Sequence, residues 1–494
     1  MITELEFKSL AGQGYNRIPL MSEAFADLET PLSLYLKLAG GPGGAKYSFL
    51  LESVIGGERF GRYSFIGLPA RTILRASGFG DAARTEIVTD GQVVETHAGN
   101  PLDVIEAYQK RFKVALRPGL PRFCGGLAGY FGYDAVRHVE KKLENTCPPD
   151  TLGTPDILLM HCEEVAVIDN LSGKLYLIVY ADPGQPEAYA KAKKRVKHLR
   201  EQLRFSVSAP QVRASTNYPA ERGFAKQDYL AAVERAKELI AAGDFMQVQV
   251  GQRISKRYTE SPLSLYRAVR SLNPSPYMIY YDFGDFHVVS ASPEILVRQE
   301  NTPEGTKVTI RPLAGTRPRG ATPEADKATE AELVADPKER AEHVMLIDLE
   351  RNDLGRVCTP GSVVVDELMT VESYAHVHHI VSNVRGELLP GATPGRVIAA
   401  VFPGGTITGC PKVRCMQVIA ELEGVGRGAY TGAMGWLSDA GDMDLNILIR
   451  SAEAEGTALR FRTGAGIVID SDPQRELEET RAKARGMLRA LGVE

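Results

Sequence analysis

Apolar side chains repeat at helical spacing in some segments of the chain and alternate at strand spacing in others. A helix is predicted by four apolar residues at three- and four-residue intervals, namely Tyr229, Val233, Ala236 and Ile240. Gly243 follows as a C-terminal cap, and residues 245–250 then alternate as a strand does. Residues 277–283 and 286–292 flank Gly284-Asp285, a two-residue turn signal that predicts an antiparallel hairpin.

The first 200 residues mix both kinds of pattern. Residues 50–66 and 157–180 hold short β-prone runs, whereas residues 186–203 are rich in Ala and Lys and have helical periodicity. Around residues 206–223 the periodicity fades and Ser, Pro and Asn accumulate, as in a connector. We therefore predict a first domain, a connector and a second domain, at residues 1–205, 206–223 and 224–494.

Size and composition limit the classes of function. The 494 residues exceed what one hydrophobic core usually supports, and 44% hydrophobic with 24% charged residues is ordinary globular composition. The net charge of -4, from 58 basic and 62 acidic residues, gives no reason to bind nucleic acid or anionic lipid. Because the sequence has no signal-peptide pattern and no apolar run of membrane-spanning length, we expect a cytoplasmic protein. The six cysteines include no CxxC pair, so we expect reduced thiols. A small molecule is the expected binding partner.

A carboxylate-bearing helix is predicted to begin at Asp336-Pro337. Asp336 is a typical N-cap, proline suits the first helical position, and Glu339 completes a capping box. Glu342 then lies in the second turn. The pattern alone favours a solvated carboxylate that pairs with Lys338.

A second such helix is predicted to begin at Asp472-Pro473. It places Glu476, Glu479 and Lys483 on one face, an arrangement that suits a hard cation and an acidic ligand, although an exposed Glu–Lys pair is the alternative. Just before it, residues 464–466 read Gly-Ala-Gly and are predicted to end one strand and start another. A ligand carboxylate can approach such a backbone closely.

The chain resembles the chorismate-utilising enzymes, and among them anthranilate synthase component I. Twelve segments carry the resemblance in the family's order, at residues 243–248, 291–294, 311–316, 341–348, 351–353, 377–382, 402–406, 409–412, 430–432, 449–451, 464–466 and 476–483. The first domain adds residues 50–53, 62–67 and 125–134. The resemblance implies an α+β fold with large mixed, mainly antiparallel sheets flanked by helices, in two intimately packed domains. It implies a first domain that binds tryptophan and a second that binds chorismate.

The resemblance also implies a metal and a substrate site. Glu342 and Glu479, with Glu476 nearby, correspond to Mg²⁺ ligands that reach the ring carboxylate of chorismate. The second carboxylate, on the enolpyruvyl arm, would be held by a group of side chains and backbone amides, namely Gly315, Thr316, Tyr430, Arg450, Gly464, Ala465, Gly466 and Lys483.

Two residues correspond to groups that move protons in the family. Glu294 corresponds to the general acid that protonates the leaving hydroxyl at C4. His379 corresponds to the histidine associated with elimination of pyruvate, where it either transfers a proton or orients the substrate. A zinc site built from His376, His378 and His379 is the alternative, whereas His343 is interpreted as structural.

The nature of the nucleophile is predicted by two positions. Ala314 stands where relatives that aminate the ring para to its carboxylate usually have a lysine, and an alanine cannot attack covalently. Gln247 stands where relatives that add water carry a lysine base, and a neutral amide cannot take a proton. The resemblance therefore implies that ammonia adds at C2 and pyruvate is eliminated, giving anthranilate, the first step of tryptophan biosynthesis. The rivals are 4-amino-4-deoxychorismate synthase and an aminodeoxyisochorismate synthase.

A regulator and a partner complete the prediction. Ser53 corresponds to a residue that contacts the polar end of inhibitory L-tryptophan, and Pro276, Tyr277 and Met278 to residues around its indole. The chain lacks the cysteine elbow that releases ammonia from glutamine, and Cys124, the nearest match, is interpreted as a core residue. A separate glutamine amidotransferase subunit, and hence a hetero-oligomer, is therefore implied. A non-catalytic tryptophan-binding homologue is the alternative from another class.

Overall fold

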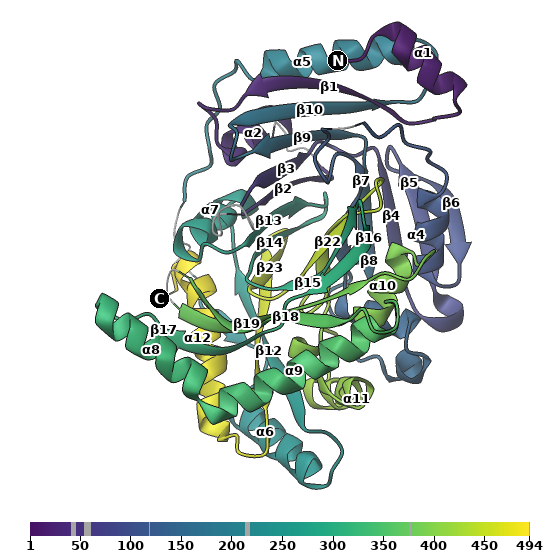
Figure 1. The fold of residues 1–494 in the computed structure, drawn as a ribbon. Coiled ribbons are helices and arrows are strands. Elements are labelled where there is room, and N and C mark those ends of the chain that lie inside the picture. The colour runs from purple at the N-terminus through teal and green to yellow at the C-terminus, as the bar shows by residue number, and fades with distance from the viewer. Residues whose placement is uncertain (41–45, 54–60, 118, 213–217, 375–376, 494) are drawn as a thin grey trace.

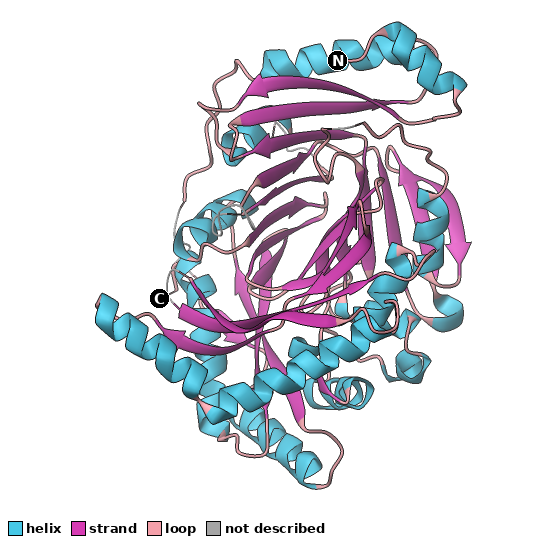
Figure 2. Cartoon of the chain, in the orientation of Figure 1, coloured by secondary structure: helices cyan, strands magenta, loops and turns pink. Residues whose placement is uncertain are grey.

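Two large sheets form the centre of the molecule (Figures 1 and 2). The computed structural model describes residues 1–493 apart from 41–45, 54–60, 118, 213–217 and 375–376. Within the described residues each sheet has 12 strands, and neighbouring strands run antiparallel. This confirms the predicted α+β class with mainly antiparallel sheets.

The first sheet has the order β1 (Ile18–Phe25), β10 (Lys174–Ala181), β9 (Glu164–Asp169), β3 (Tyr63–Gly67), β2 (Ser48–Glu52), β13 (Tyr277–Asp282), β14 (Phe286–Ser292), β23 (Ser451–Glu455), β24 (Ala458–Ile467), β12 (Gln247–Arg257) and β11 (Ala220–Arg222), with β20 (Gly409–Cys410) beside β12. The second sheet has the order β17 (Leu313–Pro318), β19 (Val377–Glu387), β16 (Gly305–Ile310), β15 (Ile295–Thr302), β22 (Met443–Ile447), β21 (Ala433–Ser438), β7 (Gly126–Phe131), β8 (Ile157–Cys162), β4 (Thr72–Ser77), β5 (Arg84–Thr89) and β6 (Gln92–Ala98), with β18 (Val364–Ser373) beside β19.

Both sheets continue across the predicted domain boundary. Strand β2 pairs with β13, where Leu50 lies opposite Tyr280, and β7 pairs with β21. Each sheet therefore contains strands from residues 1–205 and from residues 224–494. The division into two domains stays a prediction. Strand β11 lies within the predicted connector, while residues 213–217 of that connector lie outside the described residues.

Helices cover the outer faces of the sheets (Figure 2). They are α1 (Glu4–Gly12), α2 (Pro31–Leu38), α4 (Pro101–Gln109), α5 (Ala188–Gln202), α6 (Lys226–Ala241), α7 (Pro262–Leu272), α8 (Pro323–Ala335), α9 (Pro337–Gly355), α10 (Pro394–Val401), α11 (Lys412–Glu423) and α12 (Pro473–Ala490). Helix α5 packs on β10, α12 packs on β24, and α8 and α9 lie along β17 and β19 (Figure 1). None of the helices among the described residues combines the length and apolarity needed to cross a membrane.

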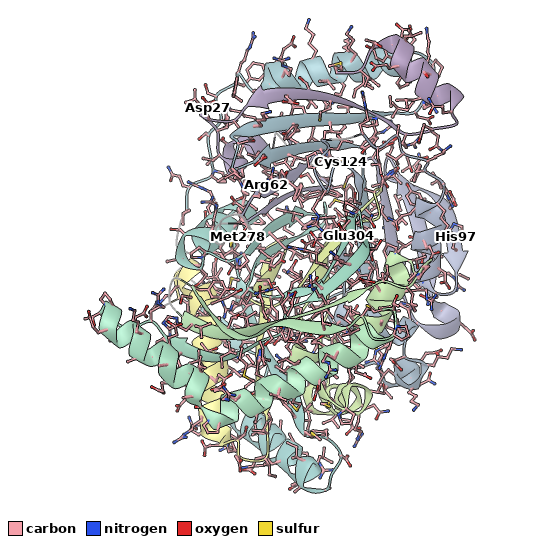
Figure 3. All side chains as sticks on the ribbon, in the orientation of Figure 1. Asp27, Arg62, His97, Cys124, Met278 and Glu304 are labelled. Atoms are coloured by element: carbon pink, nitrogen blue, oxygen red, sulfur yellow. The ribbon has the colours of Figure 1, made fainter. Side chains whose placement is uncertain are left out.

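Several local predictions are confirmed. Helix α6 contains the four periodic apolar residues, and Gly243 follows it with a φ of +85°, which glycine adopts without strain. Strands β13 and β14 form the predicted hairpin around Gly284-Asp285. All six cysteines are unpaired, and Cys124 lies in the interior together with Met278 (Figure 3).

Aromatic side chains fill the space between the two sheets. The rings of Phe123 and Trp436 stack with their centroids 5.1 Å apart, and Phe49 packs on Tyr281 at the same distance. The Tyr281 hydroxyl donates a 2.9 Å hydrogen bond to the Gly435 carbonyl on β21, which ties the first sheet to the second. Burial of these large rings provides much of the hydrophobic stabilisation that holds the sheets face to face.

Candidate functional site

Helix α9 presents Glu342 toward β12. Asp336 caps the helix by accepting hydrogen bonds from the backbone amides of Lys338 and Glu339, as predicted. The predicted capping box is not formed, because the Glu339 carboxylate instead pairs with Arg317 at 3.1 Å. Glu342 is half-buried and accepts a 2.9 Å hydrogen bond from the Gln247 side chain, rather than lying on the surface with Lys338.

Helix α12 brings three charged residues to the same region. Lys483 pairs with Glu479 at 2.8 Å and also donates a 3.0 Å hydrogen bond to the Gly464 carbonyl. Glu476 is buried, whereas Glu479 keeps about half of its side chain exposed. The exposed i, i+4 pair predicted as the alternative is therefore present, and its lysine also contacts the glycine-rich part of β24.

The Gly-Ala-Gly segment lies within a single strand, near its C-terminal end. The prediction that Gly464 to Gly466 end one strand and start another is wrong, because β24 continues from Ala458 to Ile467 and its pairing with β12 supports it throughout. Glycine is needed here for space. A Cβ added at Gly466 would lie 2.5 Å from the Gln247 side-chain nitrogen, and one at Gly464 would lie 3.0 Å from the Tyr430 hydroxyl.

Repulsion among Glu342, Glu476, Glu479 and Glu339 would favour binding of a divalent cation. The pKa of Glu342 is raised by burial and by the charges of Glu339 and Glu479, and the pKa of Glu476 is raised by burial and by Glu479. Carboxylates that repel one another in this way are relieved by a bound cation. Among the described residues no group of three or more His, Cys, Asp or Glu side chains is placed to hold a metal ion by itself, so the Mg²⁺ site stays a prediction.

Glu294 is a buried carboxyl group next to cations. It is 5% exposed, and burial raises its pKa from the ordinary value to about 7, although Arg450 and Lys483 act in the opposite direction. Its backbone is held at the start of β15 by a 3.0 Å hydrogen bond from the Ile447 amide. Glu294 can therefore carry a proton near neutral pH.

His379 on β19 presents one free ring nitrogen. Its Nδ1 lies 3.1 Å from the Gly315 carbonyl and 3.0 Å from the Thr316 hydroxyl, while its buried Nε2 has no hydrogen-bond partner among the described residues. Since a carbonyl only accepts, the proton belongs on Nδ1 and Nε2 keeps its lone pair. Burial and the charge of Arg450 lower the pKa of His379 to about 4, so the ring is neutral.

His378 and His343 are held in the core. His378 is 1% exposed and uses Nδ1 toward Ser373 and Nε2 toward Asp326, both at 2.8 Å. His343 contacts Ser382 at 2.7 Å, in agreement with a structural role. His376 lies outside the described residues. Of the other two members of the alternative zinc site, His378 has both ring nitrogens engaged, and His379 has only Nε2 free.

Tyr430 precedes β21 and Arg450 follows β22, so the two residues lie at the same end of this antiparallel pair of strands. Arg450 lies between β22 and β23 and has a φ of +52°, which is unusual for a non-glycine residue. The side chain is exposed to solvent, yet surrounding protein desolvates it enough to lower its pKa. Tyr430 is buried, and its hydroxyl approaches Gly464.

The two positions predicted to govern the nucleophile carry no amine in this site. Ala314 is 7% exposed and lies on β17 opposite Ile380. Gly315 follows in a bulge with a φ of +69°, where a Cβ would press within 3.1–3.3 Å of Leu333, Glu339 and Ile380. Gln247 uses its amide on Glu342. The bulge thus directs Gly315 and Thr316 at His379.

The residues predicted to bind tryptophan lie together at one end of β13, where Tyr277 pairs with Ser292 of β14. Glu52 pairs with Met278 across β2 and β13, so Ser53 lies next to the segment of Pro276 and Tyr277. Met278 is fully buried. Glu52 also accepts two hydrogen bonds from Arg270, at 2.5 and 2.9 Å. The predicted site thus joins the two parts of the chain.

Sequence reasoning missed a buried ion network behind Tyr430, formed by Glu423, Arg427 and Arg462. In the sequence Glu423 and Arg427 have the i, i+4 spacing of an ordinary surface pair. The glycines at 424, 426 and 428 were the available signal that this segment does not continue a helix.

Comparisons with known proteins agree with this geometry. The chorismate binding enzyme family matches residues 67–489. Anthranilate synthase component 1 of Neisseria meningitidis serogroup A is 53% identical over 99% of this chain and 98% of its own length, and that of Pseudomonas aeruginosa is 50% identical over the same shares. The crystal structure of anthranilate synthase component I from Streptococcus pneumoniae is 34% identical, covers 94% of this chain and 98% of its own, and gives a TM-score of 0.76. The menaquinone-specific isochorismate synthase of Escherichia coli, at 19% identity, a TM-score of 0.71 and coverage of 96% of this chain and 94% of its own, shares the fold.

Proposed function

The chain belongs to the chorismate binding enzyme family, and from this premise we propose that it is the large subunit of an anthranilate synthase. It would convert chorismate and ammonia to anthranilate, pyruvate and water. The observation that carries the proposal is a buried, protonatable Glu294 within the electrostatic influence of Arg450, with no amine at positions 314 and 247. Free ammonia is then the nucleophile.

Substrate binding would use charges of both signs. Arg450 and Tyr430, with the Gly464–Gly466 backbone, Gly315, Thr316 and Lys483, would hold the carboxylate of the enolpyruvyl arm, since an arginine fork suits a planar carboxylate. Glu342 and Glu479, with Glu476 beside them, would hold Mg²⁺. The ion would supply positive charge that binds the ring carboxylate.

Two side chains, Glu294 and His379, would then carry out the proton transfers. Glu294 gives its proton to the C4 hydroxyl, which leaves as water while ammonia adds at C2. His379 Nε2 carries a lone pair and is oriented by Gly315 and Thr316, so it suits removal of the C2 proton as pyruvate leaves. Whether it takes that proton itself or orients the substrate is decided by a His379→Asn variant: loss of pyruvate release with retained amination indicates proton transfer.

The test of the function is a product assay with chorismate, Mg²⁺ and an ammonium salt. We expect fluorescent anthranilate and pyruvate. An aminated product that keeps its enolpyruvyl arm would instead indicate 4-amino-4-deoxychorismate synthase or aminodeoxyisochorismate synthase, and absence of reaction would indicate a non-catalytic tryptophan-binding protein.

The purified chain is expected to use ammonium salts but not glutamine. The nearest candidate for a glutaminase nucleophile, Cys124, is buried against the Tyr180 hydroxyl at 3.3 Å, and burial raises the pKa of its thiol to about 11. A separate glutamine amidotransferase subunit would therefore supply ammonia. Steady-state rates with each nitrogen source check this, and a glutamine-dependent rate from the chain alone, lost in Cys124→Ala, would contradict it.

Tryptophan is expected to inhibit through the site around Ser53. A Ser53→Phe change places a ring where the amino acid's polar end would bind, so inhibition by tryptophan should be lost while the ammonia-dependent rate stays within about twofold. Inhibition curves for the wild type and for Ser53→Phe measure this, with Ser77→Phe, an exposed position on β4, as the control. A Ser53→Phe enzyme that tryptophan still inhibits fully would refute the assignment.

A further inference from the structure

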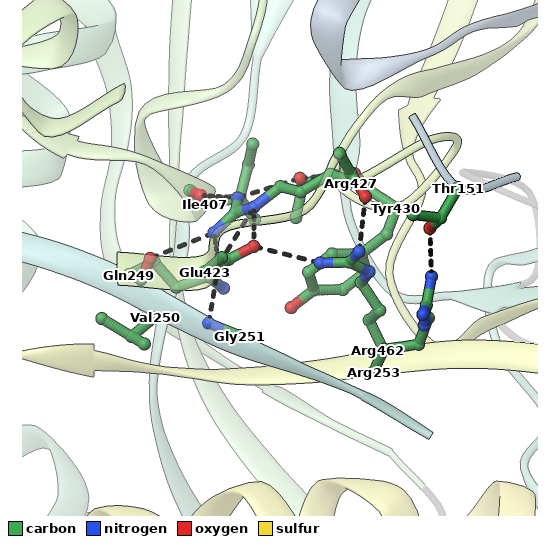
Figure 4. Close-up of polar contacts among 12 residues, drawn as sticks. Thr151, Gln249, Val250, Gly251, Arg253, Ile407, Glu423, Arg427, Tyr430 and Arg462 are labelled. Atoms are coloured by element: carbon green, nitrogen blue, oxygen red, sulfur yellow. Dashed lines mark hydrogen bonds and ion pairs between the residues drawn. The ribbon is translucent and has the colours of Figure 1, made fainter. Parts of the chain in front are cut away.

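A buried ion network lies directly behind Tyr430 (Figure 4). Glu423 ends α11, Arg427 lies in the following loop and Arg462 lies on β24, and their side chains are 1%, 1% and 3% exposed. Arg427 Nη2 lies 2.5 Å and Arg462 Nη1 3.1 Å from the Glu423 carboxylate. Two cations share one carboxylate, and burying such a group costs desolvation energy that the pairing does not clearly offset. Stability alone is therefore a poor explanation of the network.

Arg427 uses all five of its N–H donors. Nε donates to Glu423, and Nη2 donates one proton to Glu423 and the other to the Gln249 carbonyl, at 3.1 Å. Nη1 donates to the Ile407 carbonyl at 3.2 Å and to the Thr431 hydroxyl at 3.0 Å. Its guanidinium thus joins β12, α11 and two loops at fixed angles. A lysine has three donors on one nitrogen and cannot reproduce this arrangement.

The turn that Arg427 holds is strained. Thr431 has a φ of +61°, a conformation that β-branched residues rarely adopt and that persists only where the surroundings impose it. Its hydroxyl accepts from Arg427 and donates to the Tyr430 carbonyl at 2.5 Å, while its amide donates to the Leu448 carbonyl at 2.8 Å. The backbone direction of Tyr430 is fixed by these contacts.

The ring of Tyr430 is held by the same network. The Arg427 guanidinium lies between two aromatic rings, 4.7 Å from the centroid of Tyr133 and 5.5 Å from that of Tyr430. On β12, Gly251 donates to Glu423 at 2.9 Å, and a Cβ there would lie 3.2 Å from the Tyr430 ring. A neighbouring cavity of ≈ 20 Å³, lined in part by Arg427 and Tyr430, has room for water but not for a ring-sized ligand.

We propose that Arg427, itself held by Glu423, is a positioning residue that fixes Tyr430 for binding of the substrate's arm carboxylate. It contacts no substrate atom and acts through the ring of Tyr430 and the strained Thr431 turn. The inference rests on the proposed function, because Tyr430 binds an arm carboxylate only if the protein binds chorismate.

The test compares KM and kcat for chorismate in Arg427→Met, Tyr430→Phe and the double variant, with ammonium as nitrogen source. Arg427→Met leaves Glu423 and Arg462 as a one-to-one pair. We expect it to raise KM at least about tenfold while kcat changes less than about threefold, as for lost uniform binding. In the Tyr430→Phe background it should add less than about twofold, because contacting residues act non-additively. Arg17→Met is the control, since Arg17 also pairs with two carboxylates and lies over a phenylalanine ring, but in residues 1–205.

Each outcome decides between the two proposals. A KM raised by Tyr430→Phe but not by Arg427→Met overturns the positioning role and leaves the function standing. A KM unchanged by Tyr430→Phe, or a wild type that makes no anthranilate, overturns the positioning role together with that part of the proposed function. If Arg427→Met does not fold, Thr431→Val replaces the hydroxyl that Arg427 contacts by a methyl group, and an unchanged KM in that variant overturns the inference.

Discussion

Replacing Glu294 with glutamine is expected to lower kcat by about 10²–10⁴-fold, the usual contribution of a general acid, while KM for chorismate stays within about twofold. Glutamine has almost the shape of the protonated carboxyl group, so the 5% exposed site should stay filled and hydrogen bonded. Only the transferable proton is lost. Steady-state kinetics with ammonium measure both constants.

The pH profile distinguishes loss of an acid from general damage. Burial raises the pKa of Glu294 to about 7, so the group carries its proton below that pH and loses it above. The wild-type kcat/KM should therefore fall as pH rises through about 7, and this fall should be absent from the residual activity of Glu294→Gln. Asp156→Asn is the control. Burial also raises the pKa of Asp156 to about 7, but Asp156 accepts its hydrogen bond from the Gly78 amide and is not among the predicted site residues. Undiminished turnover in Glu294→Gln would remove Glu294 from the acid role.

Replacing Arg450 with methionine is expected to lower kcat/KM about 100-fold or more. A hydrogen bond to a charged group contributes about 1.5–3 kcal/mol, and each 1.4 kcal/mol corresponds to a tenfold change, so loss of a two-pronged carboxylate contact reaches this size. Most of the effect should appear in KM, since the arm carboxylate is bound before and during the reaction.

A lysine at position 450 separates charge from shape. Arg450→Lys keeps the positive charge but loses the planar fork, so its kcat/KM should fall between the wild type and Arg450→Met. Arg460→Met, which removes a partly exposed arginine paired with Glu455 at 2.9 Å on the outer end of β24, should leave KM unchanged. Equal KM values for the wild type and Arg450→Met would show that Arg450 does not bind the substrate.

Local features of the fold were predictable because local chemistry determines them. Asp336-Pro337 and Asp472-Pro473 begin helices through their own caps, and Gly284-Asp285 closes a hairpin whose register follows from the turn. The carboxylates on α9 and α12 could be placed on helix faces for the same reason.

Features that depend on distant partners were not predictable. Gly464 to Gly466 looked like a break because glycine weakens a strand, but β12 supplies the pairing that keeps the strand continuous. The positive φ of Arg450 and the burial of Arg427 also arise from packing between remote segments. Their local sequence patterns do not encode that packing.

The most direct test of the function uses ¹⁵N-labelled ammonium with chorismate and Mg²⁺, followed by mass spectrometry of the products. The candidate site, with a protonatable Glu294, a cationic Arg450 and no amine at Ala314 or Gln247, predicts ¹⁵N-labelled anthranilate and pyruvate in equal amounts. A labelled product that still carries the enolpyruvyl arm, or a hydroxylated product without label, would contradict it.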